Sequence, residues 1–94
     1  MRGVVRLGDR SCGHGCFPAR PNTQGSPNVF VNSKPAHRVG DAWDVHCCNG
    51  VCHDGVAASG SATVFVNGRA LCRVGDSISC GDMMCQGSPN VFCG

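Results

Sequence analysis

Three side chains that can bind a metal ion follow three aspartates at nearly constant distances. The distance is five residues for two histidines and four residues for a cysteine. The pairs are Asp9 and His14, Asp41 and His46, and Asp76 and Cys80. Imidazole nitrogen and thiolate sulfur are the usual ligands of Zn²⁺ in structural sites. A lone histidine is more often a polar surface residue than a ligand, but matched offsets in three places favour a shared metal site.

His53 is a fourth candidate ligand, because it follows His46 by seven residues in the segment HCCNGVCH. Three imidazoles and one thiolate form a closed tetrahedral set that suits Zn²⁺. Such a set leaves no open position for an activated water, so the metal would be structural and not catalytic. We therefore predict one structural Zn²⁺ per chain. Its predicted ligands are His14, His46, His53 and Cys80.

The other cysteines leave several arrangements open. Cys16 and Cys48 each lie seven residues after their aspartate, so they either replace a histidine as ligands or pair as a disulfide. The chain has nine cysteines, an odd number, and a protein kept in the cytosol would hold most of them as thiols or metal ligands. A second metal site or two disulfides stay open for five more, which are Cys12, Cys47, Cys52, Cys85 and Cys93.

Three copies of one sequence pattern carry the candidate ligands. Each copy has an Arg-x-Gly-Asp segment, a loop of variable length, and a Gly-Ser segment that leads into a strand. The first segment is RLGD at 6–9 and RVGD at 38–41 and 73–76, and the second is GSPNVF at 25–30 and 87–92 and GSATVF at 60–65. Copies that cannot each bury an apolar face must share one centre. The repeat therefore predicts a pseudo-threefold arrangement that gathers the offset-matched ligands on its axis.

Each Gly-Ser segment is expected to begin a short β-hairpin. Valine and phenylalanine alternate at 29–31 and 64–66, which is the period of a strand. Asn-Ser at 32–33 and Asn-Gly at 67–68 indicate tight turns, followed by the returning strands KPAHRV and RALCRV. We expect His37 and Cys72, at equivalent positions of the returning strands, to be exposed. We expect four strand residues to pack in the core, namely Val29, Phe30, Val64 and Phe65.

Composition favours one small all-β domain that spans residues 1–94. The chain has fourteen glycines and no glutamate, and good helix formers are scarce. A net charge of +2 without a basic run argues against binding to nucleic acid. No segment has the apolar length of a membrane span, and MRGVVRLGDR lacks the apolar core of a signal peptide.

The chain resembles the PAAR-repeat proteins, which are named for a Pro-Ala-Ala-Arg tetrapeptide. The tetrapeptide reads PAHR at 35–38 and, more degenerately, ALCR at 70–73. The segments GHGCFPARPN, DAWDVHCC and CHDG accompany it in order, and the resemblance covers nearly the whole chain. It implies a sharp cone of short β-hairpins with a zinc ion near the apex. The family's three histidines and one cysteine fall on His14, His46, His53 and Cys80.

The resemblance also implies a function. The base of such a cone caps the blunt end of a trimeric β-helical spike protein in a type VI secretion machine or a contractile phage tail. We expect a non-enzymatic tip, one copy per spike trimer and no homo-oligomer, which sharpens the spike and contacts the target membrane transiently. It would be made in the bacterial cytoplasm and then reside in a phage tail or leave through a contractile machine. We expect a bare tip without a fused toxin domain.

Two other functions compete with this interpretation. A free-standing small zinc-binding module is the main alternative, although no CxxC pairs occur at zinc-ribbon spacing. An enzyme with a Cys-His nucleophile pair in GHGC is the third, but a small centre saturated with ligands leaves no evident substrate pocket.

Overall fold

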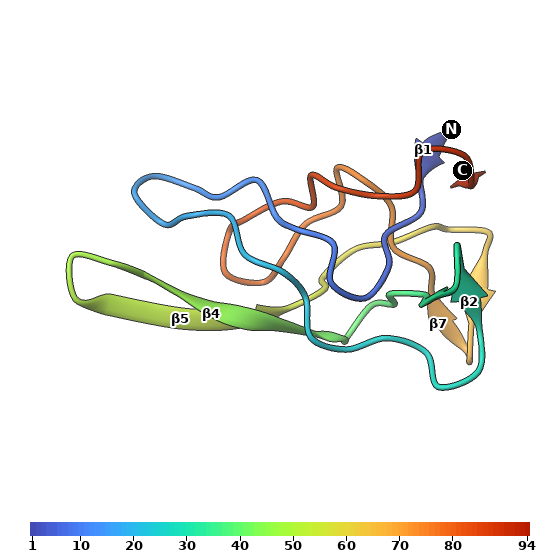
Figure 1. Cartoon of the computed structure of the whole chain (residues 1–94), viewed down its shortest axis with the longest axis horizontal. Helices are drawn as coiled ribbons and strands as arrows, with labels where there is room; N and C mark the ends of the chain where they lie inside the picture. The colour runs from blue at the N-terminus through green and yellow to red at the C-terminus, as the bar shows by residue number, and fades with distance from the viewer.

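The computed structural model describes residues 1–94, and all of its regular elements are β-strands. The prediction of an all-β chain of short antiparallel hairpins is confirmed. None of its elements is a helix that could cross a membrane. The molecule is elongated, with extents of 37 × 23 × 23 Å (Figure 1). We name the end that holds both termini and the six two-residue strands the base. The opposite end, formed by residues 11–20, 43–55 and 77–85, is the apex.

Six of the eight strands are two residues long, and they pair into three short hairpins at the base. The pairs are β2 (Phe30–Val31) with β3 (Lys34–Pro35), β6 (Phe65–Val66) with β7 (Arg69–Ala70), and β8 (Phe92–Cys93) with β1 (Arg2–Gly3). The registers match, since Phe30 pairs with Pro35, Phe65 with Ala70 and Phe92 with Gly3. The two ends of the chain therefore build the third hairpin together.

The two continuous hairpins turn where the sequence predicts. Asn32 and Ser33 have φ values of 53° and 64°, and Asn67 and Gly68 have values of 54° and 76°. Two successive residues with positive φ form the turn that matches the twist of a two-stranded hairpin. The asparagine and glycine in these turns adopt such angles at little cost.

The remaining strands form a longer antiparallel hairpin that reaches the apex (Figure 1). β4 spans Ala42–Cys48 and β5 spans Val51–Val56. His46 pairs with His53, and Cys47 pairs with Cys52. Because side chains alternate across a strand, the two histidines point to one face of this hairpin and the paired cysteines to the other.

Three backbone hydrogen bonds close a ring between the copies. The N–H of Val5 donates to the carbonyl of Cys72, that of Cys72 to His37, and that of His37 to Val5, each at 3.0 Å. All three side chains have an exposed fraction of 0%. The expectation that His37 and Cys72 are exposed is therefore wrong, because the ring places both inside the core. There the ring of His37 meets Trp43 edge-on at 5.2 Å.

Two apolar clusters fill the core on either side of this ring. The cluster toward the base contains Val4, Ala36, Val66, Leu71 and Cys93, and the other contains Val5, Trp43, Ala57, Cys72, Ile78 and Met84. Phe30 and Phe65 belong to neither and are 58% and 60% exposed. Val29 and Val64 are also more than a third exposed. The prediction that these four residues pack in the core is wrong, because the inner face of the strands carries the next valine instead.

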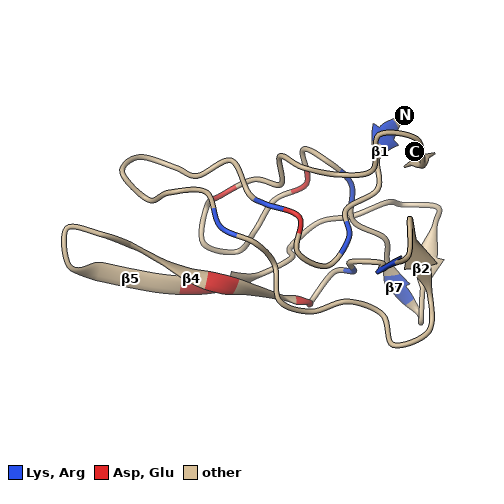
Figure 2. Cartoon of the chain, in the orientation of Figure 1, with Lys and Arg blue, Asp and Glu red and all other residues tan.

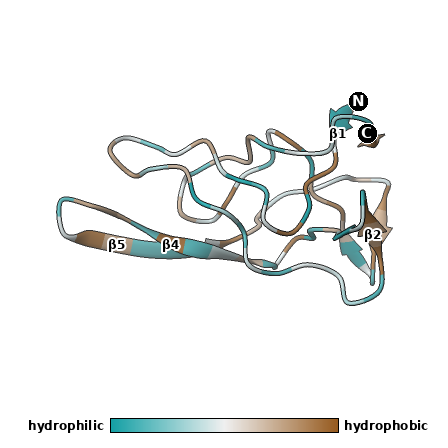
Figure 3. Cartoon of the chain, viewed as in Figure 1, coloured by the Kyte–Doolittle hydropathy of each residue, from teal (hydrophilic) through white to brown (hydrophobic).

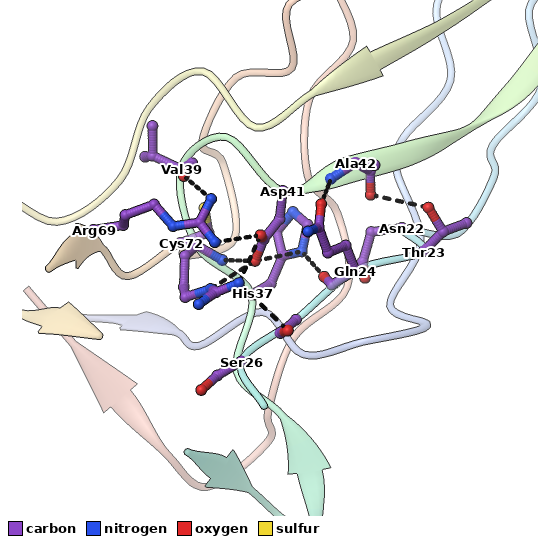
Figure 4. A network of polar contacts seen from close by, with 12 residues as sticks. Asn22, Thr23, Gln24, Ser26, His37, Val39, Asp41, Ala42, Arg69 and Cys72 are labelled. Atoms are coloured by element: carbon purple, nitrogen blue, oxygen red, sulfur yellow. Dashed lines mark hydrogen bonds and ion pairs between the residues drawn. The ribbon is translucent and has the colours of Figure 1, made fainter. Parts of the chain in front are cut away.

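The Arg-x-Gly-Asp segments form three copies of an ion-paired turn in which the aspartate is buried. The guanidinium–carboxylate distances are 2.8 Å for Arg6–Asp9, 2.9 Å for Arg38–Asp41 and 3.0 Å for Arg73–Asp76. Figure 4 shows the second copy, where Arg69 adds a contact to Asp41 at 3.1 Å. Burial by itself would raise the pKa of Asp41, but the hydrogen bonds from Arg38 outweigh it and lower this pKa.

In the Gly-Ser segments the serine accepts a hydrogen bond at the start of each hairpin, and the glycine lies where a side chain would clash. The hydroxyl of Ser26 accepts a hydrogen bond from the N–H of Val29 at 2.9 Å, and Ser61 and Ser88 repeat this contact. A Cβ atom at Gly25 would lie 2.7 Å from the Cβ of Pro35, so no side chain fits there. The repeated Gly-Ser segments are therefore the places where the three base hairpins begin.

Candidate metal centre

The four sequence-predicted ligands lie together at the apex. His14 comes from the first loop, His46 and His53 are cross-strand partners in β4 and β5, and Cys80 comes from the third loop. Their ligand atoms all lie within 4.8 Å of one another. The three copies of the repeat thus each contribute to one group of metal-ligating side chains.

The spacing of the ligand atoms fits a tetrahedral ion. The Nε2 atom of His14 lies 3.3 Å from that of His46 and 3.2 Å from that of His53. The Nε2 atoms of His46 and His53 are 2.6 Å apart, and Cys80 Sγ is 4.0 Å from His46 Nε2. In a tetrahedral site with Zn–N bonds of about 2.0–2.1 Å, ligand nitrogens are about 3.3 Å apart. Two of the three separations match this value, and the third is shorter.

A backbone carbonyl orients His46 for binding. The Nδ1 atom of His46 lies 2.8 Å from the carbonyl oxygen of Pro18. A carbonyl oxygen only accepts hydrogen bonds, so Nδ1 carries the proton and the lone pair is on Nε2. Nε2 is the atom that faces His14 and His53. This contact holds His46 in the tautomer that a metal ligand needs.

Phe17 covers the three histidines. Its ring stacks on those of His53 and His14, with ring centroids 4.2 and 4.9 Å apart. It is tilted against the ring of His46, with centroids 4.8 Å apart. Burial, together with the neighbouring imidazoles of His46 and His14, lowers the pKa of His53. A lowered pKa keeps this imidazole neutral, which is the form that binds a metal ion.

Arg20 contacts Cys80, although no sequence pattern points to this arginine. Its Nη2 donates to Cys80 Sγ at 3.2 Å, and its Nη1 pairs with Asp82 at 2.8 Å. Its Nε donates to the carbonyl of Asp44 at 2.8 Å, and the guanidinium lies 5.6 Å from the ring centroid of Trp43. Nothing in the segment FPARP signals a contact sixty residues away.

Six cysteines around this group form three disulfides. The pairs are Cys12–Cys85, Cys16–Cys48 and Cys47–Cys52. Cys16 and Cys48 therefore pair with each other and are not ligands. Of the arrangements that the sequence leaves open, the structure has disulfides, because the loops bring six sulfurs into bonding contact. Of the three free cysteines, Cys72 and Cys93 are buried, and only Cys80 belongs to the group of four candidate ligands.

A model of one protein family matches most of the chain. The family is described as "PAAR motif", and the match covers residues 13–86, which include all four clustered ligands. No curated protein matches the chain.

Proposed function

The chain belongs to the PAAR-motif family, and from this premise we propose that it is the tip of a spike in a contractile injection machine. The family is a structural one, of spike tips. In this proposal the base caps the blunt end of a trimeric β-helical spike protein. The apex then leads, so that it sharpens the spike and meets the target membrane first. The protein is made in the bacterial cytoplasm and ends in a phage tail or is delivered by a type VI secretion machine.

One observation carries this proposal, namely that the base exposes the same apolar side chain from each of its three hairpins. Phe30, Phe65 and Phe92 occupy one register position and are 58%, 60% and 48% exposed. Figure 3 shows the hydrophobic β2 at this end. Exposed apolar groups gathered at one end mark an interaction surface. Three equivalent groups suit a partner with threefold symmetry, so one chain matches one trimer.

The charge of the base adds a chemical requirement for the partner. Lys34, Arg69 and Arg2 occupy the equivalent first position of the three returning strands, and the base strands contain no acidic residue. Arg69 and Arg2 also reach Asp41 and Asp76, at 3.1 and 3.5 Å, whereas Lys34 has no ion-pair partner within the chain. Figure 2 shows the basic β1 and β7 at this end, with the acidic residues farther toward the apex. A spike end with acidic groups would complement this arrangement. Added salt should then weaken the complex.

We infer that the apex group binds one Zn²⁺ with a structural role. The three histidines and one cysteine form the nitrogen and sulfur set that zinc prefers, and a hydrogen bond from Arg20 positions the sulfur. Bound zinc supplies a crosslink between loops from all three copies. With four protein ligands the site has no open position for a substrate or an activated water. This argues for a scaffold and against an enzyme.

The test is the mass of the complex between this chain and a trimeric β-helical spike protein. We expect one chain per trimer by native mass spectrometry. A variant with Phe30→Ser, Phe65→Ser and Phe92→Ser should remain folded and lose the complex. Three chains per trimer, or binding that survives the triple substitution, would contradict the proposed capping.

A further inference from the structure

Each disulfide of the apex joins two of the segments that carry the candidate ligands. Cys12–Cys85 joins the loop of His14 to the loop of Cys80, Cys16–Cys48 joins the loop of His14 to β4 with His46, and Cys47–Cys52 joins β4 to β5 with His53. No two segments are joined twice, and none is left out. Three bridges therefore link four ligand segments into one covalent series.

The bridges also lie close to the ligands along the chain. Cys12 and Cys16 stand two residues on either side of His14. Cys47 directly follows His46, and Cys52 directly precedes His53. In the β4–β5 hairpin the pair Cys47–Cys52 is the next register position after His46–His53, so this disulfide holds the two strands together beside the two ligands.

From this arrangement we propose that the redox state of the six cysteines controls how long the apex keeps its metal ion. In the reduced protein, only the metal and non-covalent contacts, such as those of Arg20 with Asp82 and Cys80, gather loops that belong to different copies of the repeat. In the oxidised protein, the disulfides hold the four ligands near their binding positions, so a ligand that dissociates from the metal returns to it before the ion escapes. The inference rests on the proposed binding of metal at this site.

The oxidation needs an external disulfide as the electron acceptor. For each bridge two thiols give up two electrons and two protons, and the acceptor is cleaved to two thiols through a mixed disulfide. Five of the six paired cysteines are exposed, and Cys48 is partly exposed, so a small disulfide or a thiol–disulfide oxidoreductase can reach the pairs. The acceptor is thus of a class found in oxidising compartments.

The three other cysteines do not compete for these pairings. Burial raises the pKa of the Cys72 thiol and of the Cys93 thiol, which makes both poor nucleophiles for exchange. Cys80 is itself a candidate ligand and contacts Arg20 and His46. The odd number of cysteines is accounted for by three bridges, one candidate ligand and two buried thiols.

The experiment compares zinc release from the reduced and the oxidised full chain. Zinc-loaded protein is prepared with a thiol reductant or with oxidised glutathione, freed of the reagent, and mixed with a coloured chelator. We expect release from the oxidised protein to be slower by about tenfold or more. A single disulfide commonly stabilises the folded arrangement of the segments that it joins by at least a factor of about ten in the equilibrium constant. Peptide mapping by mass spectrometry should find the three pairings in the oxidised sample only. Equal release rates with all three bridges formed would overturn the proposal.

Matched variants assign the effect to one bridge. The double variant Cys47→Ser and Cys52→Ser removes only the bridge beside His46 and His53, and we expect its oxidised form to release zinc faster than the oxidised wild type. Cys93→Val is the control, because Val31 and Val66 hold the equivalent positions in the other copies, and it should release zinc like the wild type. If the double variant matches the wild type, the bridge beside the histidines does not retain the metal.

Two outcomes separate this inference from the proposed function. Protein that takes up no zinc in either redox state refutes both the metal site and its redox control. Protein that takes up zinc, binds a spike trimer and releases zinc at one rate in both states keeps the proposed function and loses only the inference drawn here.

Discussion

Two neighbouring side chains of β6 should separate binding of the spike from folding of the tip. Phe65 is 60% exposed at the base, whereas Val66 is 7% exposed in the core, because successive side chains of a strand point to opposite faces. We predict that Phe65→Ser weakens binding to the spike and leaves the free energy of unfolding nearly unchanged. Val66→Ala should lower the free energy of unfolding and leave the affinity for the spike nearly unchanged.

The size of each effect follows from exposed area. A phenylalanine side chain presents about 200 Å², so roughly 120 Å² of Phe65 is available for a partner to cover, given its exposed fraction of 60%. At about 25 cal/mol per Å² this area gives at most about 3 kcal/mol, which corresponds to a loss of affinity of up to about 150-fold. Val66→Ala removes two buried methyl groups and should cost about 1–3 kcal/mol of unfolding free energy.

The assay is denaturant unfolding of each zinc-loaded variant, together with its affinity for an immobilised spike trimer. The neighbours Phe30 and Val31 in β2 provide a second pair of the same kind, although Val31 is less deeply buried. Suppose that Phe65→Ser unfolds about 2 kcal/mol more easily and binds the spike as before. The phenylalanine would then pack in the folded core, and the reasoning from exposure would be refuted.

Three further predictions concern the apex and the core. Cys80→Ala should lower the zinc content of dialysed protein from about one per chain and cost several kcal/mol of stability, as measured by elemental analysis and thermal unfolding. Arg20→Met should weaken zinc binding by about 10- to 100-fold in a chelator competition and cost about 3 kcal/mol, because it leaves the buried Asp82 unpaired. His37→Leu should flatten the loss of unfolding free energy on acidification below about pH 6.5, measured by denaturant unfolding.

The pH prediction follows from the surroundings of His37. Burial lowers the pKa of His37, and this outweighs the hydrogen bond to the carbonyl of Gln24 and the nearby carboxylates of Asp41 and Asp9. Arg38 acts in the same direction as burial. The unfolded chain therefore binds a proton near pH 6.5 that the folded chain takes up only at lower pH, so stability falls as pH decreases through this window. Identical acid profiles of the wild type and His37→Leu would show that His37 does not contribute.

Opposing outcomes are equally specific at the apex. Full zinc content and unchanged stability in Cys80→Ala would mean that this sulfur is not a ligand. For Arg20, the control is the conservative variant Arg20→Lys. A lysine keeps the positive charge but lacks the planar guanidinium that reaches Asp82 and Cys80 together. If Arg20→Met binds zinc as tightly as the wild type does, the contact with Cys80 has no role in metal binding.

The repeat makes much of the fold and the site predictable. Offsets counted from Asp9, Asp41 and Asp76 pick out side chains that lie together in the structure, because each aspartate belongs to the same turn in three equivalent places. Strand period is less informative. It shows that Phe65 and Val66 point to opposite faces but not which face is inside, and the structure has the valine inside.

Matched offsets offer Cys16–Cys48 as a possible disulfide, but the other two pairings and the contacts of Arg20 follow from no local pattern. Spacing in the sequence assigns no disulfide partner to Cys12, Cys47, Cys52 or Cys85, because disulfide connectivity depends on which loops lie together in the folded chain. Arg20 likewise reaches Cys80 and Asp82 across the interface between two copies. Such contacts are consequences of the assembled symmetry and can be read only once the copies are in place.

The third hairpin shows how the symmetry closes. Residues 2–5 precede RLGD in the sequence as Lys34–His37 precede RVGD, so the N-terminal segment is a returning strand whose partner lies at the other end of the chain. β8 pairs with β1 in the register that the continuous hairpins use, and the N–H of Val5 completes the ring with Cys72 and His37. The third equivalent phenylalanine at the base therefore depends on the most distant pairing in the chain. A threefold surface made by a single chain requires this pairing, because without it the base would offer two complete hairpins to a partner with three equal sides.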